Sequence, residues 1–352
     1  MAKSRVIGLD IGTTHVRAVE IEFGSGGPAG RGTPEVVRFG HVELPIGAVR
    51  DGEVAEPQTV ASALRRLWAD AKFSHKEVVI GVGNQRVLVR DLDLPAMPIA
   101  QLRASLPFQV QDLIPVAVED ALLDYFPTGT ADGPHGPVFR GLLVAATKET
   151  VKANTSAVEL AGLRPMMVDL NAFALARVQA RGDLALGTIA LVDIGARVTN
   201  LVIVSAGQPR FVRILPSGGH DVTEAVANAM NIPIETAERI KRDIGVGRAV
   251  AAELKSAEES ITDVTSSLVE AIRNTLVYYA SNNPGGAVEQ ILLTGGGAFL
   301  PGLGQFLSSS SRLPVSIGQP LSTLKVGRGV GDIGELQSVL AVPLGLAFGV
   351  AA

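Results

Sequence analysis

The residues best suited to chemistry lie in a polar turn between two apolar segments near the N-terminus. Residues 6–22 read VIGLDIGTTHVRAVEIE, and both apolar runs have the β-branched content expected of paired strands. Gly12, Thr13 and Thr14 fall at the turn, where backbone N–H groups and hydroxyls suit a phosphate. Asp10 precedes the turn and carries the oxygen ligands that a hydrated metal ion prefers. An ordinary hairpin turn without a ligand is the competing interpretation of this isolated stretch.

A second copy of the pattern lies half a chain away. Residues 189–204 read IALVDIGARVTNLVIV, which aligns Asp193 with Asp10 and Gly195 with Gly12 at an offset of 183 residues (193 minus 10). The repeat predicts two similar domains, each with an acid-bearing hairpin. Two such hairpins facing each other across a cleft would hold a polyphosphate from both sides, with Asp10 and Asp193 near a common cation.

A third element is a glycine run that follows an apolar strand. Residues 288–300 read VEQILLTGGGAFL, which predicts a strand over Val288–Leu293 and then Gly295, Gly296 and Gly297. Three glycines let a flat ligand approach the backbone closely, although such a run is also typical of a tight strand-to-helix turn. Its position after the two Asp-Gly turns favours a shared binding site.

The composition limits the class of protein. The 352 residues are 47% hydrophobic and 19% charged, with 4% aromatic residues, which predicts roughly two domains with aliphatic cores. Cysteine is absent and the five histidines have no ligand spacing, so disulfides and His or Cys metal centres are not expected. A formal net charge of −4 argues against nucleic-acid binding. The most apolar tract, 340–352, is too short and too interrupted to cross a bilayer, and no signal-peptide core is present, so a cytoplasmic protein is expected.

These motifs resemble those of the actin-like ATPase superfamily, which includes actin, sugar kinases, heat-shock chaperones and the cell-division protein FtsA. Within it, the chain is similar to the PilM family of type IV pilus assembly proteins. The resemblance implies an α/β actin-like ATPase fold, with two related RNase H-like domains, an FtsA-like 1C subdomain and a 2B subdomain. It also implies that ATP and Mg²⁺ bind at the two hairpins and the glycine run. Further similar segments are LPFQVQDLIPVAVEDALLDYFP, GLLVAATKETVKANTSAVELAGLRPMMVDLNAFALAR and SGGHDVTEAVANAMNIPIETAERIKRDIG.

The resemblance assigns phosphate contacts to both turns and the adenosine contact to the three glycines. Arg17 stands where most members have lysine. The positive charge is kept, but the planar guanidinium changes the geometry of a phosphate contact. An exposed strand arginine is the alternative. The second turn lacks the hydroxyls of the first, which leaves Gly195, Thr199 and the backbone to meet phosphate. Asp10 and Asp193 would bind Mg²⁺ through water molecules.

Two helical positions complete the implied site. Glu238 and Lys241 lie three residues apart, where PilM and FtsA carry a similar Glu-x-x-Lys that meets adenosine and ribose; a surface ion pair is the alternative. Asn171 falls where actin places the glutamine that orients the attacking water. It is therefore a candidate catalytic residue, together with Asp10 and Asp193. Because asparagine more often caps a helix, ATP binding is better supported than hydrolysis.

The resemblance also divides the chain into subdomains. Subdomain 1A comprises 1–83 and a return at 164–187, and the inserted 1C-like subdomain comprises 84–163. Subdomain 2A comprises 188–218 and 287–335, and it encloses the mostly helical subdomain 2B at 219–286. A C-terminal helix over 336–352 is expected to pack on 1A. Within 1A, the apolar period predicts a helix over 57–71.

The leading hypothesis is a cytoplasmic ATP-binding protein of type IV pilus assembly or a related pilus or secretion system. The resemblance implies that a groove between 1A and 1C binds the N-terminal cytoplasmic tail of a PilN-like inner-membrane protein. That contact would hold the chain at the membrane's inner face without insertion. Other pilus assembly partners and self-association stay open.

Two alternatives belong to the same superfamily. One is an FtsA-like filament protein, although the tail GLAFGVAA has no basic amphipathic face for a membrane surface. The other is a small-molecule kinase, which would need a catalytic acid and a polar acceptor pocket. The sequence reveals no such group of residues.

Overall fold

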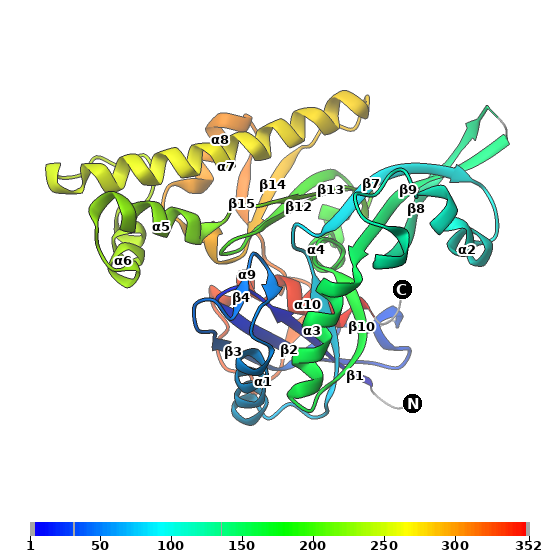
Figure 1. The fold of residues 1–352 in the computed structure, drawn as a ribbon, viewed down its shortest axis with the longest axis horizontal. Helices are drawn as coiled ribbons and strands as arrows, with labels where there is room; N and C mark the ends of the chain where they lie inside the picture. The colour runs from blue at the N-terminus through cyan, green and yellow to red at the C-terminus, as the bar shows by residue number, and fades with distance from the viewer. Residues whose placement is uncertain (1–3, 31, 135, 350–352) are drawn as a thin grey trace.

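The computed structural model describes residues 4–30, 32–134 and 136–349, and it contains two large β-sheets of related topology (Figure 1). The first sheet has the strand order β10-β6-β1-β2-β3-β16. β1, β2 and β3 are antiparallel neighbours, whereas β6 runs parallel to β1 and β10 parallel to β6. The bounds are β1 (Ser4–Ile11), β2 (His15–Phe23), β3 (Glu35–Glu43), β6 (Glu77–Val82), β10 (Arg164–Leu170) and β16 (Lys325–Val326).

The second sheet repeats this arrangement in the order β13-β12-β11-β14-β15. Three antiparallel neighbours are again followed by two parallel strands, in the same relation as β3-β2-β1-β6-β10. The bounds are β11 (Thr188–Ile194), β12 (Thr199–Ser205), β13 (Gln208–Leu215), β14 (Gln290–Thr294) and β15 (Val315–Ile317). The prediction of two related domains is confirmed.

The register of the two hairpins preserves the sequence repeat. Asp10 pairs with Arg17 across β1 and β2, and Asp193 pairs with Asn200 across β11 and β12. Cross-strand partners project their side chains on the same face of a sheet. Each acid is therefore accompanied by its strand partner, and Asn200 occupies in the second domain the position that Arg17 has in the first.

An apolar layer of two helices, α4 (Asn171–Gln179) and α10 (Ala341–Ala347), joins the two sheets. α10 packs on β1 and β2, while α4 packs on α10 and β12. One continuous hydrophobic cluster therefore includes residues of both sheets and both helices, among them Val19, Ile21, Leu175, Leu191, Val202 and Leu344.

Glycines make the close packing of α10 possible. A Cβ on Gly8 of β1 would lie 1.9 Å from Pro343 O, and a Cβ on Gly345 would lie 1.9 Å from Ala174 O. A side chain at either position would push backbone elements apart. The layer between the sheets is thus fixed by backbone contact as well as by apolar burial.

The outer face of the first sheet is covered by α1 (Pro57–Ala71) and α3 (Lys148–Leu160). α1 has the bounds predicted from its apolar period, and it buries Val60, Leu64 and Leu67. The short strands β4 (Val49–Arg50) and β5 (Glu53–Val54) form a hairpin next to this layer, and η1 (Gly27–Ala29) follows β2.

The insert is a three-stranded antiparallel sheet in the order β7-β9-β8. Its elements are β7 (Val87–Pro95), α2 (Ile99–Gln109), η2 (Val118–Asp120), β8 (Ala121–Gly133) and β9 (Gly136–Thr147), and they share a separate hydrophobic core. The predicted insert, 84–163, also contains α3. In the structure α3 packs against α1, and its Ala157 and Val158 belong to the core of the first domain.

The helical subdomain of the second domain is formed by α5 (Gly219–Met230), α6 (Ile234–Ile244) and the first part of α7 (Lys255–Asn282). The rest of α7 and α8 (Leu303–Ser311) cover the second sheet. Figure 1 places this subdomain and the insert at opposite ends of the view. Three short turns, η3 (Gly182–Ala185), η4 (Ala252–Leu254) and η5 (Gly296–Phe299), complete the chain together with α9.

The expected C-terminal helix is instead two short helices, α9 (Leu336–Val339) and α10, and residues 350–352 lie outside the described part. α10 packs on the first sheet. Within the described ranges, no helix has both the length and the apolar composition of a membrane span.

Gly345→Ala should destabilise the protein, because the added Cβ would meet Ala174 O at 1.9 Å. Overpacking of this kind costs about 1–3 kcal/mol, and urea unfolding measures the loss. Gly304→Ala in α8 is the matched control, since its nearest atom, Val315 Cγ1, is 3.9 Å away. The control should change the free energy of unfolding by no more than about 1 kcal/mol. Equal effects of the two variants would contradict the close-packing argument.

Candidate functional site

The two Asp-Gly turns have the same backbone geometry. Gly12 N donates to His15 O at 3.0 Å, and Gly195 N donates to Val198 O at 3.0 Å. A Cβ on Gly195 would lie 2.8 Å from Val198 O, so the tight turn requires glycine there. In the first turn, Thr14 Oγ1 and His15 Nδ1 are 3.1 Å apart. Both turns therefore offer compact backbone with little side-chain bulk.

The two acids of the repeat lie close enough to influence each other. Burial raises the pKa of Asp193 to about 6; the hydrogen bond from Thr294 Oγ1, at 2.8 Å, opposes this effect, and the charge of Asp10 adds to it. Burial also raises the pKa of Asp10, against the charge of Arg17, whose Nη1 is 3.7 Å from Asp10 Oδ2. Two mutually repelling, partly desolvated carboxylates are a donor set that favours a cation.

These two carboxylates do not amount to an all-protein metal cage. Within residues 4–30, 32–134 and 136–349, no group of three or more His, Cys, Asp or Glu side chains is arranged to hold a metal ion. Mg²⁺ commonly takes one or two carboxylates and fills its remaining positions with water and substrate phosphates. The pair Asp10 and Asp193 therefore fits a hydrated Mg²⁺ that arrives with a nucleotide.

The third glycine run lies against the second hairpin. Gly295 has φ +82°, and a Cβ on it would lie 2.4 Å from Ile194 O. A Cβ on Gly297 would lie 2.4 Å from Ile194 Cγ2, whereas a Cβ on Gly296 would meet no atom within 4 Å. Two of the glycines thus permit close packing on β11, and Gly296 faces open space.

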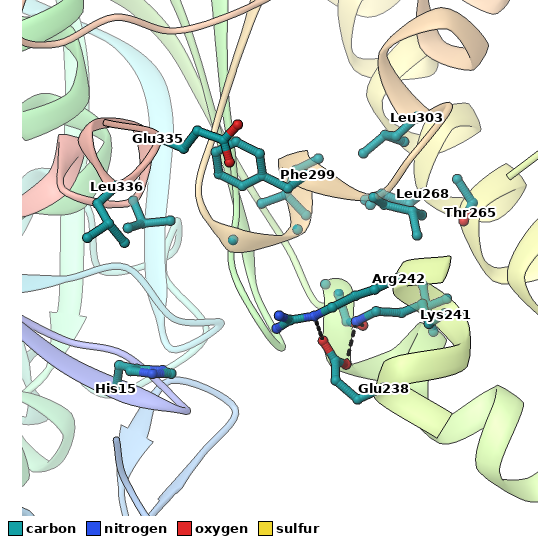
Figure 2. Close-up of a pocket in the computed structure, with 18 of the residues that line it drawn as sticks. His15, Glu238, Lys241, Arg242, Thr265, Leu268, Phe299, Leu303, Glu335 and Leu336 are labelled. Carbon is teal, nitrogen blue, oxygen red and sulfur yellow. Dashed lines mark hydrogen bonds and ion pairs between the residues drawn. The ribbon is translucent and has the colours of Figure 1, made fainter. Parts of the chain in front are cut away.

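A cavity of about 720 Å³ lies between the two domains (Figure 2). Five of the predicted binding residues line it: Arg17, Glu238, Lys241, Gly296 and Gly297. The other predicted residues of the turns, Asp10, Gly12, Thr13, Thr14, Asp193, Gly195 and Gly295, are not part of its wall and belong to the turns beside it. The remaining lining residues are His15, His41, Ile194, Gly218, Gly219, Val222, Arg242, Thr265, Leu268, Phe299, Leu300, Leu303, Glu335, Leu336, Val339 and Leu340.

Glu238 and Lys241 form a largely buried pair in the cavity wall. Lys241 Nζ donates to Glu238 Oε2 at 2.6 Å, to Thr223 Oγ1 at 2.8 Å and to Gly219 O at 3.0 Å. Burial raises the pKa of Glu238, but the hydrogen bonds from Lys241 and Thr223 outweigh it, and the net shift is downward. Lys241 is only 8% exposed. The geometry therefore differs from a solvent-exposed ion pair on a helix.

Thr199 lies beneath the second turn. It is fully buried, and its hydroxyl donates to Ser217 O at 2.7 Å. That bond fixes the loop that leads into Gly218 and Gly219 of the cavity wall. A structural role follows for Thr199, and its hydroxyl is not available to a phosphate in this arrangement.

Asn171 begins α4 at the junction between the domains, outside the wall of the cavity. Its Oδ1 and the Oδ1 of Asn200 are both buried, and neither has a hydrogen-bond partner among the described residues. Both side chains converge on Gly83, where a Cβ would lie 2.8 Å from Asn200 Oδ1 and 2.9 Å from Asn171 Nδ2. Asn200 was not among the predicted site residues, although it follows Arg17 by the same 183 residues that separate Asp193 from Asp10.

Several cavity residues were also missed. Gly218 caps the start of α5 and Gly219 is its first residue, in a Ser-Gly-Gly sequence that favours close approach of backbone to a ligand. Arg242 follows Lys241 directly, and its Nε donates to Glu238 Oε1 at 2.7 Å. The apolar lining, such as Leu268 and Leu303, had no sequence signal because it resembles ordinary core.

The stability of the first hairpin should depend on pH through His15. Burial, with the charges of Arg17, His41 and Arg242, lowers the pKa of His15 to about 4, whereas the ordinary value is 6.5. Between these values the unfolded chain takes up a proton that the folded chain does not, so stability falls as the pH drops from 6.5 towards 4. His15→Gln should reduce the acid-dependent loss measured by urea unfolding. An unchanged pH dependence would contradict this.

A family model described as "Type IV pilus assembly protein PilM" matches residues 8–350. Among solved structures, the "PilM-PilN type IV pilus biogenesis complex" has a TM-score of 0.83 and 26% identity, and the match covers 99% of this chain and 98% of that chain. MreB5 of Spiroplasma citri bound to ADP has a TM-score of 0.53 and 16% identity, with coverages of 97% and 94%.

The curated relatives include a division protein of the same superfamily. Cell division protein FtsA of Enterococcus hirae is 27% identical, over 86% of this chain and 76% of that protein. FtsA of Bacillus subtilis (strain 168) is 21% identical, over 84% of this chain and 74% of that protein. These matches and the structural similarities confirm the predicted actin-like fold. Because the family match spans nearly the whole chain, the protein belongs to the PilM family of type IV pilus assembly proteins.

Proposed function

We propose that the protein binds ATP with Mg²⁺ in the cavity between its two domains. The observation that carries the proposal is one cavity whose wall includes a residue from each motif: Arg17, Ile194 and Gly296. The carboxylates of Asp10 and Asp193 lie beside this wall. Arg17 and the two hairpin turns would meet the phosphates. Gly295, Gly296 and Gly297 would meet the adenosine, and Glu238 and Lys241 the ribose.

Asp10 and Asp193 would hold Mg²⁺ through water molecules. Bound there, the ion would neutralise charge on the phosphates. In its absence the two acids repel each other, which supports a cation between them. Asp193 is further oriented by Thr294, which leaves the rest of its carboxylate for water ligands.

We also propose that hydrolysis is slow without partners. Asn171 is one methylene shorter than glutamine, and it begins α4 outside the cavity wall. Its unpartnered Oδ1 leaves a role in orienting water open to it. The described cavity wall contains two carboxylates, those of Glu238 and Glu335. Glu238 is already hydrogen-bonded to Lys241 and Thr223. A small-molecule kinase, which needs a dedicated catalytic acid, therefore has less support than an ATP-binding assembly protein.

Gly296→Val should weaken ATP binding at least about tenfold, because Gly296 lines the cavity and a Cβ added there meets no protein atom within 4 Å, which leaves the new side chain to occupy ligand space. Isothermal titration with ATP and Mg²⁺ measures the change. Gly129→Val is the matched control, since this strand glycine also has no neighbour within 4 Å and lies in the insert. The control should bind like the wild type.

Equal binding by wild type and Gly296→Val would contradict the site assignment, as would a wild type that binds no nucleotide. The same samples should release phosphate far more slowly than about 10 per second, the rate of a typical enzyme. Turnover near that rate, dependent on a sugar or carboxylate, would favour the kinase alternative.

The proposed partner is the N-terminal cytoplasmic tail of a PilN-like inner-membrane protein. Its support is the family membership together with the similarity to the PilM-PilN complex over 99% of this chain. We propose that the insert forms one wall of the receiving groove, with the first domain as the other. The protein would then reach the inner face of the membrane through this partner. We propose that further pilus proteins and other copies of this chain are additional partners. The FtsA relatives, at 21% and 27% identity, give a filament role less support.

The insert offers an apolar anchor for such a tail. Leu106 and Ile114 are buried in the insert's own core, and Leu113 packs against it. Phe108, in the same segment, is 85% exposed at the end of α2. A large exposed aromatic side chain is able to act as an anchor for a partner, and we propose that role for Phe108.

Phe108→Ser should weaken binding of a labelled synthetic PilN-like tail by at least about tenfold, since aromatic anchors carry much of the energy of small interfaces. Fluorescence anisotropy measures the affinity. Stability should be preserved because the ring is exposed. Val277→Ser is the control, as Val277 is 59% exposed on α7 of the second domain, and it should bind the tail like the wild type. Equal affinity of Phe108→Ser and wild type, or flotation of the purified protein with bare liposomes, would overturn the proposal.

A further inference from the structure

Basic side chains from both domains meet at the cavity. His15, Arg17 and His41 line it from the first domain, and Arg242 lines it from α6 of the second. The rings of His15 and His41 are 6.1 Å apart. The charges of Arg17 and Arg242 help to lower the pKa of His15 to about 4, so His15 is neutral near pH 7 and the two guanidinium groups supply the positive charge around it. Convergent charges of one sign in a cleft attract an oppositely charged ligand.

Arg242 is held with its outer nitrogens free for a ligand. Its Nε donates to Glu238 Oε1 at 2.7 Å, while Glu238 Oε2 is occupied by Lys241 and Thr223. Among the described residues, no hydrogen bond or ion pair engages the two terminal nitrogens of Arg242, and its side chain is 75% exposed. Figure 2 shows the guanidinium reaching into the space between the domains, with these nitrogens turned away from Glu238.

We propose that Arg242 binds the phosphate chain of the nucleotide and draws the second domain over it. The inference rests on the proposed nucleotide binding and adds a contact that crosses the cleft. A phosphate between Arg242 and the first hairpin would accept hydrogen bonds from the planar guanidinium on one side and face Arg17 on the other. Since the two arginines belong to different domains, one anion attracts both walls of the cavity.

Other roles for Arg242 lead to different expectations. A solvated surface arginine, paired only with Glu238, would add almost nothing to ligand binding. A guanidinium stacked on the base would add the same amount to the binding of ATP and of adenosine. A phosphate contact adds to the binding of ATP and ADP alone. A comparison of these ligands therefore separates the three roles.

The test is Arg242→Gln, titrated calorimetrically with ATP, ADP and adenosine. Loss of a charge-assisted contact should weaken ATP and ADP about tenfold and leave adenosine within about twofold of wild type. Arg239→Gln is the matched control. It removes the same charge from an exposed position on the same helix, outside the cavity wall. The control should bind all three ligands like the wild type.

Three results would overturn the inference while leaving nucleotide binding intact. These are unchanged ATP affinity in Arg242→Gln, equal weakening for ATP and adenosine, and an equal loss of ATP affinity in Arg239→Gln. A wild-type protein that binds neither ATP nor ADP would instead overturn the proposed function, and this inference with it. Because the Arg242 side chain is 75% exposed, the variant should fold normally, and urea unfolding checks that it does.

Discussion

The layer of α4 and α10 between the two sheets is the constraint on which the rest of the structure depends. The sheets meet through this layer, and its apolar cluster continues into both of them. Gly8 and Gly345 bring backbone against backbone there, so the spacing cannot relax without opening the core. With the bases of the two domains fixed, their hairpin turns must face each other across the cleft above. The cavity is therefore a consequence of how the two halves are joined.

The electrostatics of the cleft are arranged for a ligand with both signs of charge. Asp10 and Asp193 lie at the turns with raised pKa values, while Arg17 and Arg242 line the cavity. A cation alone would neutralise the two acids and leave the basic side chains without a counter-charge. A polyphosphate alone would neutralise the basic side chains and leave the acids without one. The proposed metal–nucleotide complex would satisfy both sets, because its phosphates would face the basic side chains and its metal ion the acids.

Local patterns in the sequence predicted the hairpins and α1, because alternation and helical period record which face of an element is buried. They could not predict which partner covers that face. The pattern of α3, for example, placed it in the predicted insert, whereas its buried face packs against α1 of the first domain. Thr199 appeared to suit phosphate, but its buried hydroxyl donates to the carbonyl of Ser217 instead. The apolar wall around Leu268 and Leu303 comes from separate helices and acquires meaning only in three dimensions.

The two hairpin turns have the same backbone hydrogen bond, but their arginine side chains contact different parts of the structure. In the first, Arg17 extends into the cavity beside Asp10. In the second, Arg197 pairs with Asp221 and Glu224 of α5, and the first amides of α5 donate to carbonyls of the turn. Lys241 then ties α6 to the start of α5 through Gly219 O. The second turn, α5 and α6 are thus one hydrogen-bonded unit. A phosphate bound at this turn would therefore contact a unit that continues through α5 to α6.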